Sequence, residues 1–362
     1  MKTKTTKKQH NPLDTIMPFL EDPKNSEILI DGHQHFQVVT QGKLTDVPSP
    51  FKTEAQLMEL IQAIAEPFGQ RADESHPILD LRLQDGSRVH VVIPPISLRG
   101  PAVTIRKATT GRTTAKELVE LGVCSQEMID FLEACVKARL NILVAGGNNS
   151  GKTTLLAIIA NMIPEEERIV LLQREEILLN KPRLVQLETR PANLEGRGEI
   201  TMRQLVNSAV NLRAERIVTQ ELTGAETLDI LQAMNSGFDG CVQGIHATST
   251  FDALVRLEEM VSYANPSLPT LSVRSLIASA LDVIVFAERL RSGQRRLMKI
   301  TEVTGLNDSV VTLRDIFEFR QLGLKNGQIE GNFPATGNIP NFMQRMQDMG
   351  IELPLAIFTP KK

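Results

Sequence analysis

The sequence has few of the residues that mark disulfide-rich secreted proteins or proteins that stack nucleic-acid bases. Its 362 residues include three cysteines, one tyrosine, 13 phenylalanines and no tryptophan. Cys124, Cys135 and Cys241 are too few and too widely spaced for a disulfide framework or a zinc cluster, which favours a reducing compartment. With so few aromatic rings, the chain has little material for a base-stacking platform.

The chain also lacks a strong net charge and a long apolar run. Lys and Arg number 40 against 43 Asp and Glu, a formal net charge of -3, which argues against a protein that coats nucleic acid. The lysine-rich start has no apolar core of the kind that a signal peptide needs. The richest apolar stretch, Leu276 to Phe286, is broken by Asp282 and is shorter than the ~20 residues of a membrane span. We expect a cytoplasmic protein with no nucleic acid as a partner.

The length predicts two or three domains, and the pattern of the first one is that of short strands with one helix. We expect residues 1–13 to form a disordered tail and residues 14–108 to form a small α+β domain. Asp31-Gly32 and Asp85-Gly86 are hairpin-type dipeptides, and each lies between two apolar runs. Residues 109–117 are expected to be a linker.

From residue 118 onward the pattern changes to helices that alternate with short, fully apolar strands. The predicted strands are Asn141–Ala145, Arg168–Leu172, Arg216–Thr219, Val242–Ile245 and Val283–Phe286. Buried strands that alternate with helices are typical of an α/β fold with a mostly parallel sheet covered on both faces. We assign residues 118–306 to this domain and residues 307–362 to a C-terminal extension packed on it.

One motif in the second domain predicts its chemistry. The residues Gly146, Gly147, Asn148, Asn149, Ser150, Gly151, Lys152 and Thr153 fit the phosphate-loop pattern G-x-x-x-x-G-K-[ST]. A predicted strand ends directly before them and a predicted helix, Thr154–Ile163, begins directly after them. Glycines let the backbone curl so that N–H groups converge on phosphate oxygens at the positive end of the helix. Lys152 is expected to reach the β- and γ-phosphates, and the Thr153 hydroxyl to hold Mg²⁺.

Hydrolysis additionally requires a carboxylate near the metal and the attacking water. The predicted strand Arg216–Thr219 leads into Gln220-Glu221, and ligands of parallel sheets bind outside the carboxyl ends of the strands. Glu221 is therefore the candidate for the acid that organises metal and water; the alternative is a solvated glutamate at a strand end. His246 follows the strand Val242–Ile245 and could sense the γ-phosphate, and the alternative for it is a packed or surface histidine.

Beyond these motifs, long segments of the chain resemble the secretion and pilus-assembly ATPases of type II and type IV systems, and among them the CpaF-like branch of tight-adherence (Flp) pili. These segments are ADESHP (72–77), LQDGSRVHVVIPP (83–95), GPAVTIRK (100–107), LETRPANLEGRGEIT (187–201), LDILQAMNSGFDG (228–240), GIHATSTFDALVRLEEMV (244–261) and ITEVTG (300–305). The resemblance implies a RecA-like P-loop ATPase domain after the N-terminal α+β domain, with ATP and Mg²⁺ as cofactors. It further implies a hexameric ring at the cytoplasmic face of the inner membrane, peripheral to it through partners, with an inner-membrane platform protein as one partner.

Carried over residue by residue, the resemblance implies further members of the site. It extends the phosphate loop to Thr154, makes Glu221 the second acidic site and centres the histidine box on His246. It also implies roles near the nucleotide or a subunit boundary for several arginines, with a surface charge as the alternative for each: Arg88, Arg106, Arg190, Arg197 and Arg213.

The chain departs from the family pattern at three places. Gln173-Arg174 stand where the family has a Glu-Asp pair whose glutamate is the favoured base, and Glu175 and Glu176 are displaced by two residues. Glu175 can substitute only if the strand end slips. The acidic motif reads Gln220 to Gly224 (QELTG) where the family has Gly-Glu-x-Arg-Gly. Asn148-Asn149 replace Thr-Gly in the phosphate loop, which is tolerable if Asn149 adopts a left-handed conformation.

Three functions therefore stay open. The first is an ATP-hydrolysing hexameric motor that powers pilus assembly or protein secretion. The second is a hydrolytically weak, nucleotide-binding paralogue that serves as a regulatory or structural subunit of such a machine. The third is a RecA-like DNA motor, which fits neither the N-terminal domain nor the near-neutral charge.

Overall fold

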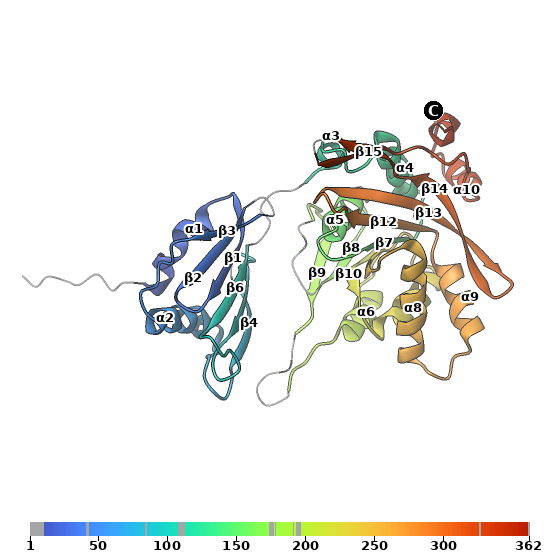
Figure 1. Ribbon diagram of the computed structural model, residues 1–362. Helices are drawn as coiled ribbons and strands as arrows, with labels where there is room; N and C mark the ends of the chain where they lie inside the picture. Colours follow the sequence, from blue (N-terminus) through green and yellow to red (C-terminus); the bar gives the residue numbers. More distant parts are fainter. Residues whose placement is uncertain are drawn as a thin grey trace, which may run out of the picture. The chain divides into compact units, whose positions relative to one another are not determined.

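The computed structural model describes residues 11–40, 43–83, 85–107, 113–173, 177, 179–190, 192, 197–325 and 327–360. The chain forms two compact units, Met1–Arg112 and Thr113–Lys362 (Figure 1). The first unit contains the expected α+β domain, and the second contains the phosphate-loop motif.

The first unit is built on an antiparallel sheet with the strand order β3-β2-β1-β6-β5-β4. Its strands are β1 (Asn25–Asp31), β2 (His35–Thr40), β3 (Lys43–Val47), β4 (Ile78–Arg82), β5 (Arg88–Val92) and β6 (Ala102–Arg106). Its helices are η1 (Pro12–Thr15), α1 (Met17–Glu21), α2 (Glu54–Ala65) and η2 (Glu66–Phe68). Gly32 and Gly86 have positive φ values of 64° and 84° in the β1–β2 and β4–β5 connections, as their hairpin dipeptides predict.

The core of the first unit lies between this sheet and α2. Alternate strand residues are buried, for example Leu79 and Leu81 on β4, and they pack in one cluster with Leu57, Leu60 and Ile61 of α2. Thr53 caps α2 by accepting a hydrogen bond from the Gln56 N–H. The predicted α+β domain is thereby confirmed.

The second unit contains an eight-stranded sheet with the order β14-β13-β12-β7-β11-β10-β8-β9. The strands from β12 to β9 in this order are parallel, whereas β13 and β14 continue the sheet antiparallel. The strands are β7 (Ile142–Gly146), β8 (Ile169–Gln173), β9 (Leu184–Glu188), β10 (Arg216–Leu222), β11 (Val242–His246), β12 (Val283–Arg289), β13 (Arg295–Asn307) and β14 (Val310–Glu318). The predicted α/β class with a mostly parallel sheet is confirmed.

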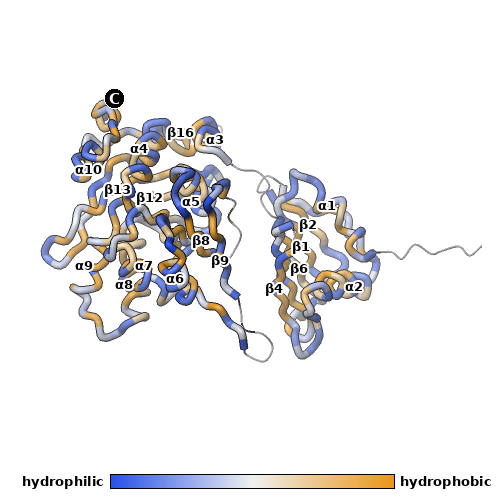
Figure 2. The backbone as a smooth tube through the Cα atoms, turned by 180° about the vertical axis from the view of Figure 1, so that it is seen from behind, coloured by the Kyte–Doolittle hydropathy of each residue, from blue (hydrophilic) through white to orange (hydrophobic). Residues whose placement is uncertain are grey.

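Helices cover both faces of this sheet. One apolar cluster joins the sheet to α3 (Ala115–Glu120), α4 (Gln126–Lys137), α5 (Lys152–Asn161), α10 (Met343–Asp348) and η3 (Leu355–Phe358). The other joins it to α6 (Met202–Asn211), α7 (Glu226–Asn235), α8 (Thr250–Ala264) and α9 (Thr270–Ala280). Each residue of β7 is buried, because the strand contributes Ile142 and Val144 to the first cluster and Leu143 and Ala145 to the second. Hydrophobic segments accordingly run through the sheets of both units (Figure 2).

The C-terminal part of the chain is more closely integrated than the sequence predicts. A division at residue 306 runs through the end of β13, and β14 pairs along β13 in the same sheet. The chain leaves that sheet after Glu318 and enters a ribbon of β15 (Arg320–Lys325) and β16 (Gln328–Asn332). Three apolar cross-strand pairs, Ile300–Phe317, Val303–Leu313 and Leu306–Val311, help to explain why this stretch extends the sheet instead of forming an appendage.

Candidate functional site

The phosphate-loop motif connects β7 to α5 by a tight turn. Gly146 ends the strand, and a Cβ atom there would overlap the Ser150 side chain and would lie 2.7 Å from the Ala287 carbonyl oxygen. Asn149 has a φ of 59° and Gly151 a φ of 90°, both in the left-handed region. Asn149 therefore adopts the conformation under which it can replace a glycine. The backbone of the loop is curled as an anion-binding loop requires.

The N-terminus of α5 differs from those of α6 and α8. Thr201 and Ser249 cap α6 and α8 with their side chains, whereas α5 is preceded by Gly151, which has none to offer. Among the described residues, the first-turn N–H groups of α5 find one weak acceptor, Ser150 Oγ, which lies 3.4 Å from the Lys152 nitrogen. Unsatisfied N–H groups at the positive end of a helix form a ready site for phosphate oxygens.

An ion pair joins the loop to β10, which is two strands from β7 in the sheet order. Lys152 Nζ lies 2.6 Å from Glu221 Oε1, the lysine side chain being 9% exposed and the glutamate 34%. The pair brings together two residues 69 positions apart in the sequence. The cation and the carboxylate that phosphoryl transfer requires thus lie side by side at the carboxyl ends of the parallel strands.

A β-bulge in β10 directs Glu221 to this position. Thr219 pairs with Gln243 but Leu222 pairs with Ile245, so two residues of β10 lie opposite Gly244 alone. Val218 packs in the cluster with α5, whereas Leu222 packs in the opposite cluster with α7, although an unbroken strand would place both on one face. The extra residue returns Glu221 to the α5 face. Gly244 permits the bulge, because a Cβ atom there would overlap the Gln220 carbonyl oxygen.

Two other residues that the sequence analysis singled out also lie at the carboxyl ends of the parallel strands. His246 ends β11 and pairs in register with Gly146, and it is half-buried. None of the described residues hydrogen-bonds to its ring. Gln173 ends β8 and is buried, with Oε1 accepting a hydrogen bond from the Ile177 N–H at 3.0 Å. Arg174, Glu175 and Glu176 lie outside the described residues.

The structure does not bring the candidate arginines of the second unit to the phosphate loop. Arg190 follows β9, which is four strands from β7 in the sheet order, a separation of roughly 19 Å at the usual strand spacing. Its Nε donates to the Gly198 carbonyl oxygen at 2.7 Å. Arg213 precedes β10 and is exposed, so it lies at the edge of the parallel sheet opposite to Glu221. A role for Arg213 near the nucleotide or a subunit boundary therefore stays a proposal, because the chain's own Glu221 lies at the other end of β10.

The remaining arginines lie elsewhere. Arg197 is an exposed residue just before α6. In the first unit, Arg106 of β6 lies 3.7 Å from Glu27, and Arg88 of β5 donates from Nε to Asp80 at 2.8 Å. These two side chains have acidic neighbours within their own unit, and a role toward the nucleotide stays a proposal for them.

One arginine at the site was missed from the sequence. Arg295, the first residue of β13, donates from Nε to the Asn149 carbonyl oxygen at 3.0 Å. The two residues are 146 positions apart, and no motif connects them. Only the sheet order, which places β12 beside β7 and β13 beside β12, reveals the contact.

These residues fit a nucleoside triphosphate with Mg²⁺. The curled loop and the start of α5 offer N–H groups, Lys152 offers a point charge, and the exposed Thr153 offers a hydroxyl. Among the described residues no group of three or more His, Cys, Asp or Glu side chains could hold a metal by itself. Mg²⁺ usually takes one or two protein ligands together with phosphate oxygens and water, and the Thr153 hydroxyl and the Glu221 carboxylate are oxygen ligands of that kind.

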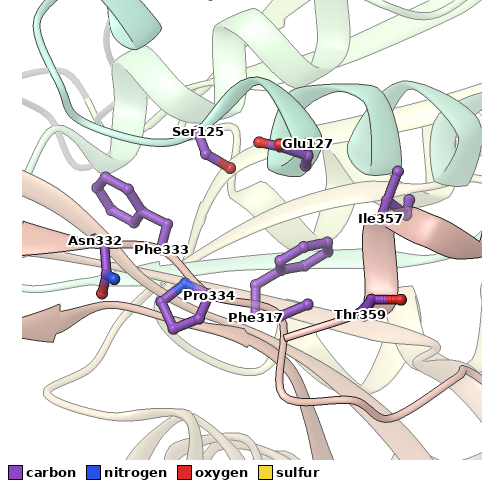
Figure 3. A pocket seen from close by; sticks show the side chains of 9 residues that line it. Ser125, Glu127, Phe317, Asn332, Phe333, Pro334, Ile357 and Thr359 are labelled. Atoms are coloured by element: carbon purple, nitrogen blue, oxygen red, sulfur yellow. The ribbon is translucent and has the colours of Figure 1, made fainter. Parts of the chain in front are cut away.

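A pocket of about 260 Å³ lies elsewhere, between the start of α4 and the C-terminal segments. Phe317, Phe333 and Pro334 line it on one side, and Ser125 and Thr359 are among its polar residues (Figure 3). None of its lining residues belongs to the phosphate loop or to β10.

In the described part of the chain, none of the helices has the length and apolar character that crossing a membrane requires.

Fold and site together define a P-loop nucleotide-binding protein with an α/β domain and an antiparallel α+β domain. The chain belongs to the type II/IV secretion system protein family, whose model matches residues 9–319. It is 30% identical over 328 residues to a Mycobacterium tuberculosis protein named for conjugal transfer, covering 84% of this chain and 93% of that protein. It is 27% identical over 330 residues to the type IV secretion system protein VirB11 of Bartonella quintana, covering 80% and 91%.

Solved structures agree on the fold. The ATPase DotB of Legionella pneumophila matches with a TM-score of 0.58 and 18% identity over 86% of this chain and 84% of that chain. The pilus retraction motor PilT with bound ADP matches with a TM-score of 0.58 and 17% identity over 93% and 86%.

Proposed function

We propose that this protein is an ATPase that uses ATP and Mg²⁺ to power a secretion or pilus-assembly machine. The observation that carries the proposal is the Lys152–Glu221 pair, which links the phosphate loop to the bulged strand β10 at 2.6 Å. The family membership and the conjugal-transfer and secretion names of the relatives support the same class of machine.

The geometry suggests how binding prepares hydrolysis. Lys152 exchanges its bond with Glu221 for phosphate oxygens, which the N–H groups of the loop and of α5 also bind. The exchange frees the Glu221 carboxylate, which then holds the metal and orients the attacking water. Bound ATP would supply the phosphoanhydride to be cleaved, and Mg²⁺ held by Thr153 and Glu221 would supply charge neutralisation for its phosphates. His246, beside Gly146, is positioned to donate to the terminal phosphate.

We further propose that the subunits form a hexameric ring at the cytoplasmic face of the inner membrane, bound there through a platform protein. A head-to-tail ring would let a neighbouring subunit offer Arg190 or Arg213, which the chain's own site does not use. Arg106 of the first unit is proposed to face the phosphates. Within the family, the quoted sequence segments favour the tight-adherence (Flp) pilus branch.

The test is ATP binding and turnover by the purified protein, with light scattering to measure its oligomeric state. Lys152→Ala should weaken ATP binding at least about 100-fold, and Glu221→Gln should keep binding but lower turnover by about 10²–10⁴. Lys116→Ala, on the exposed face of α3, is the charge-matched control and should do neither. Unchanged affinity in Lys152→Ala would contradict the site, and a monomer in the presence of ATP and Mg²⁺ would contradict the motor.

A second candidate function, a hydrolytically weak regulatory or structural subunit, is favoured by Gln173. Its amide cannot accept a proton at neutral pH, and its Oε1 is already bonded to the Ile177 N–H. If this residue limits hydrolysis, the double substitution Gln173→Glu with Arg174→Asp should raise kcat within the range of about 10²–10⁴ assigned to a positioned base. No gain, with ATP affinity unchanged, would favour the regulatory function.

A further inference from the structure

The phosphate loop is contacted from outside by an arginine of the β12–β13 hairpin. Arg295 Nε donates to the Asn149 carbonyl oxygen at 3.0 Å. Its Cδ atom would lie 3.2 Å from a Cβ atom added at Gly151. The side chain therefore passes over Gly151 and ends on Asn149, the two left-handed residues of the loop.

The left-handed conformation of Asn149 has a cost that glycine would not have, because a Cβ atom crowds the following carbonyl. If Asn149 left this region, its carbonyl oxygen would rotate away from Arg295 and the hydrogen bond would break. The bond thus selects the conformation in which the N–H groups that follow Asn149 take part in the curl.

The hairpin that presents Arg295 is itself held in place. Arg295 pairs with Arg289 in the β12–β13 register. The adjacent Gln294 accepts hydrogen bonds through Oε1 from the Ser292 hydroxyl and the Ile329 N–H, and its Nε2 donates to Gln328 at 3.1 Å. Contacts to both β12 and the β16 end of the ribbon fix the backbone that carries Arg295, so that the bond to Asn149 has to order only one exposed side chain.

We propose that Arg295 is a positioning residue that holds the phosphate loop in its phosphate-binding shape and offsets the cost of Asn149. The inference rests on the proposed nucleotide site but is tested separately from it. Its distinctive consequence is that the requirement for Arg295 depends on the residue at 149: with glycine there, the loop no longer needs the hydrogen bond.

Four proteins test this dependence: Arg295→Ala, Asn149→Gly, the double variant, and Arg291→Ala as control. Arg291 lies on the same hairpin and is exposed, and no described residue bonds to its side chain. It therefore matches the loss of one positive charge from this hairpin without the loss of the bond. Two quantities are measured: the Kd for ATP and ADP by calorimetry, and hydrogen exchange of the 146–152 segment without nucleotide.

We expect Arg295→Ala to weaken nucleotide binding roughly 10-fold, the worth of one hydrogen bond of about 1.4 kcal/mol, and to accelerate exchange in the loop. Arg291→Ala should change Kd less than about twofold. In the Asn149→Gly background, Arg295→Ala should lose most of its effect on both quantities. A merely structural role for Arg295 would lower the unfolding midpoint and weaken binding equally with Asn or Gly at 149.

The outcomes separate the two proposals. A wild-type protein that binds no nucleotide overturns the proposed function, while the exchange data still test the loop. Equal effects of Arg295→Ala and Arg291→Ala overturn the inference, because charge alone would then explain them. Full additivity of Arg295→Ala and Asn149→Gly overturns it too.

Discussion

Strand β10 has an ion pair near each of its ends, and the two pairs are built for different purposes. At its start, Arg216 Nε lies 2.6 Å from Glu167. Near its end, Glu221 lies 2.6 Å from Lys152. The distances are equal, but the surroundings of the two pairs differ.

In the first pair, Arg216–Glu167, the hydrogen-bonding capacity of both side chains is saturated. The Arg216 side chain is fully buried, bonds to both carboxylate oxygens of Glu167, and donates to the carbonyl oxygens of Val136 and Gly240. Arg139 donates to Glu167 as well. Gly240 has a φ of 76°, and a Cβ atom there would overlap the Arg216 guanidinium, so the backbone is shaped around the arginine. A buried charge is tolerated only with this degree of satisfaction.

In the second pair, Lys152–Glu221, both side chains have hydrogen-bonding positions that no described residue occupies. Lys152 makes one side-chain hydrogen bond among the described residues, and the Glu221 side chain is one-third exposed. An ammonium group has three donors and a carboxylate about four acceptor positions, so both groups can take a ligand. The difference teaches that exposure and unsaturated bonding, and not the distance between the charges, separate the pair proposed to bind nucleotide from the structural one.

The largest change in stability is expected when the Arg216–Glu167 pair is broken. Glu167→Ala leaves Arg216 buried without a counter-charge, which should lower the free energy of unfolding by about 3–5 kcal/mol. Lys152→Ala should lower it by less than Glu167→Ala does, because the Glu221 side chain left behind is one-third exposed and water can bond to its carboxylate. Urea unfolding of both variants measures the contrast. Equal losses would mean that the two ends of β10 do not differ as described.

A second substitution tests the bulge that separates the two pairs. Gly244→Ala forces a Cβ atom against the Gln220 carbonyl oxygen, which should cost about 1–3 kcal/mol of stability as overpacking does and should lower kcat by displacing Glu221. Gly323→Ala is the control, because this strand glycine has nothing within 4 Å of its added Cβ. Full turnover in a destabilised Gly244→Ala protein would show that Glu221 does not depend on the bulge.

A smaller effect comes from pH. Burial raises the pKa of Glu167, but the hydrogen bonds and charge of Arg216 and the charge of Arg139 outweigh it and lower the pKa below its ordinary value of 4.5. A carboxyl with a lowered pKa in the folded state stabilises the protein above its unfolded pKa and loses that contribution as the pH falls through the folded one.

The stability of the wild type should therefore fall more steeply below about pH 4.5 than that of Glu167→Gln, by a fraction of the loss expected for Glu167→Ala. Denaturation midpoints measured from pH 6 to about pH 3 compare the two proteins. Parallel curves would indicate that Glu167 does not contribute to the acid sensitivity.

Local patterns in the sequence predicted much of this arrangement. The phosphate loop, β7 and α5 follow from one motif between an apolar strand and a helix, because each is determined by neighbouring residues. The left-handed Asn149 follows from the same motif. The bulge does not, since Gln220-Glu221 looks like a strand end until Gly244 of the next strand is placed beside it.

The features that the sequence did not predict depend on contacts between residues that are distant in sequence. Arg295 reaches Asn149 only through the strand order, and the β13–β14 pairing erases the division expected at residue 306. Arg213 lies eight residues before Glu221 in the sequence. The two residues are nevertheless far apart in space, because the strand between them is extended. Proximity in sequence predicts proximity in space within a turn or a helix, and not along a strand.

The smallest expected effect concerns that arginine. Arg213 is exposed and precedes a strand of seven residues whose other end has Glu221, a separation of roughly 20 Å. Arg213→Ala should therefore change the stability by less than about 0.5 kcal/mol and the Kd of the isolated subunit for ATP by less than about twofold. Calorimetry at a concentration where light scattering finds monomers measures that affinity. Weaker binding by the monomer would contradict the separation of the two ends of β10. A loss of turnover that appears only at concentrations where the ring forms would instead assign Arg213 to the site of a neighbouring subunit.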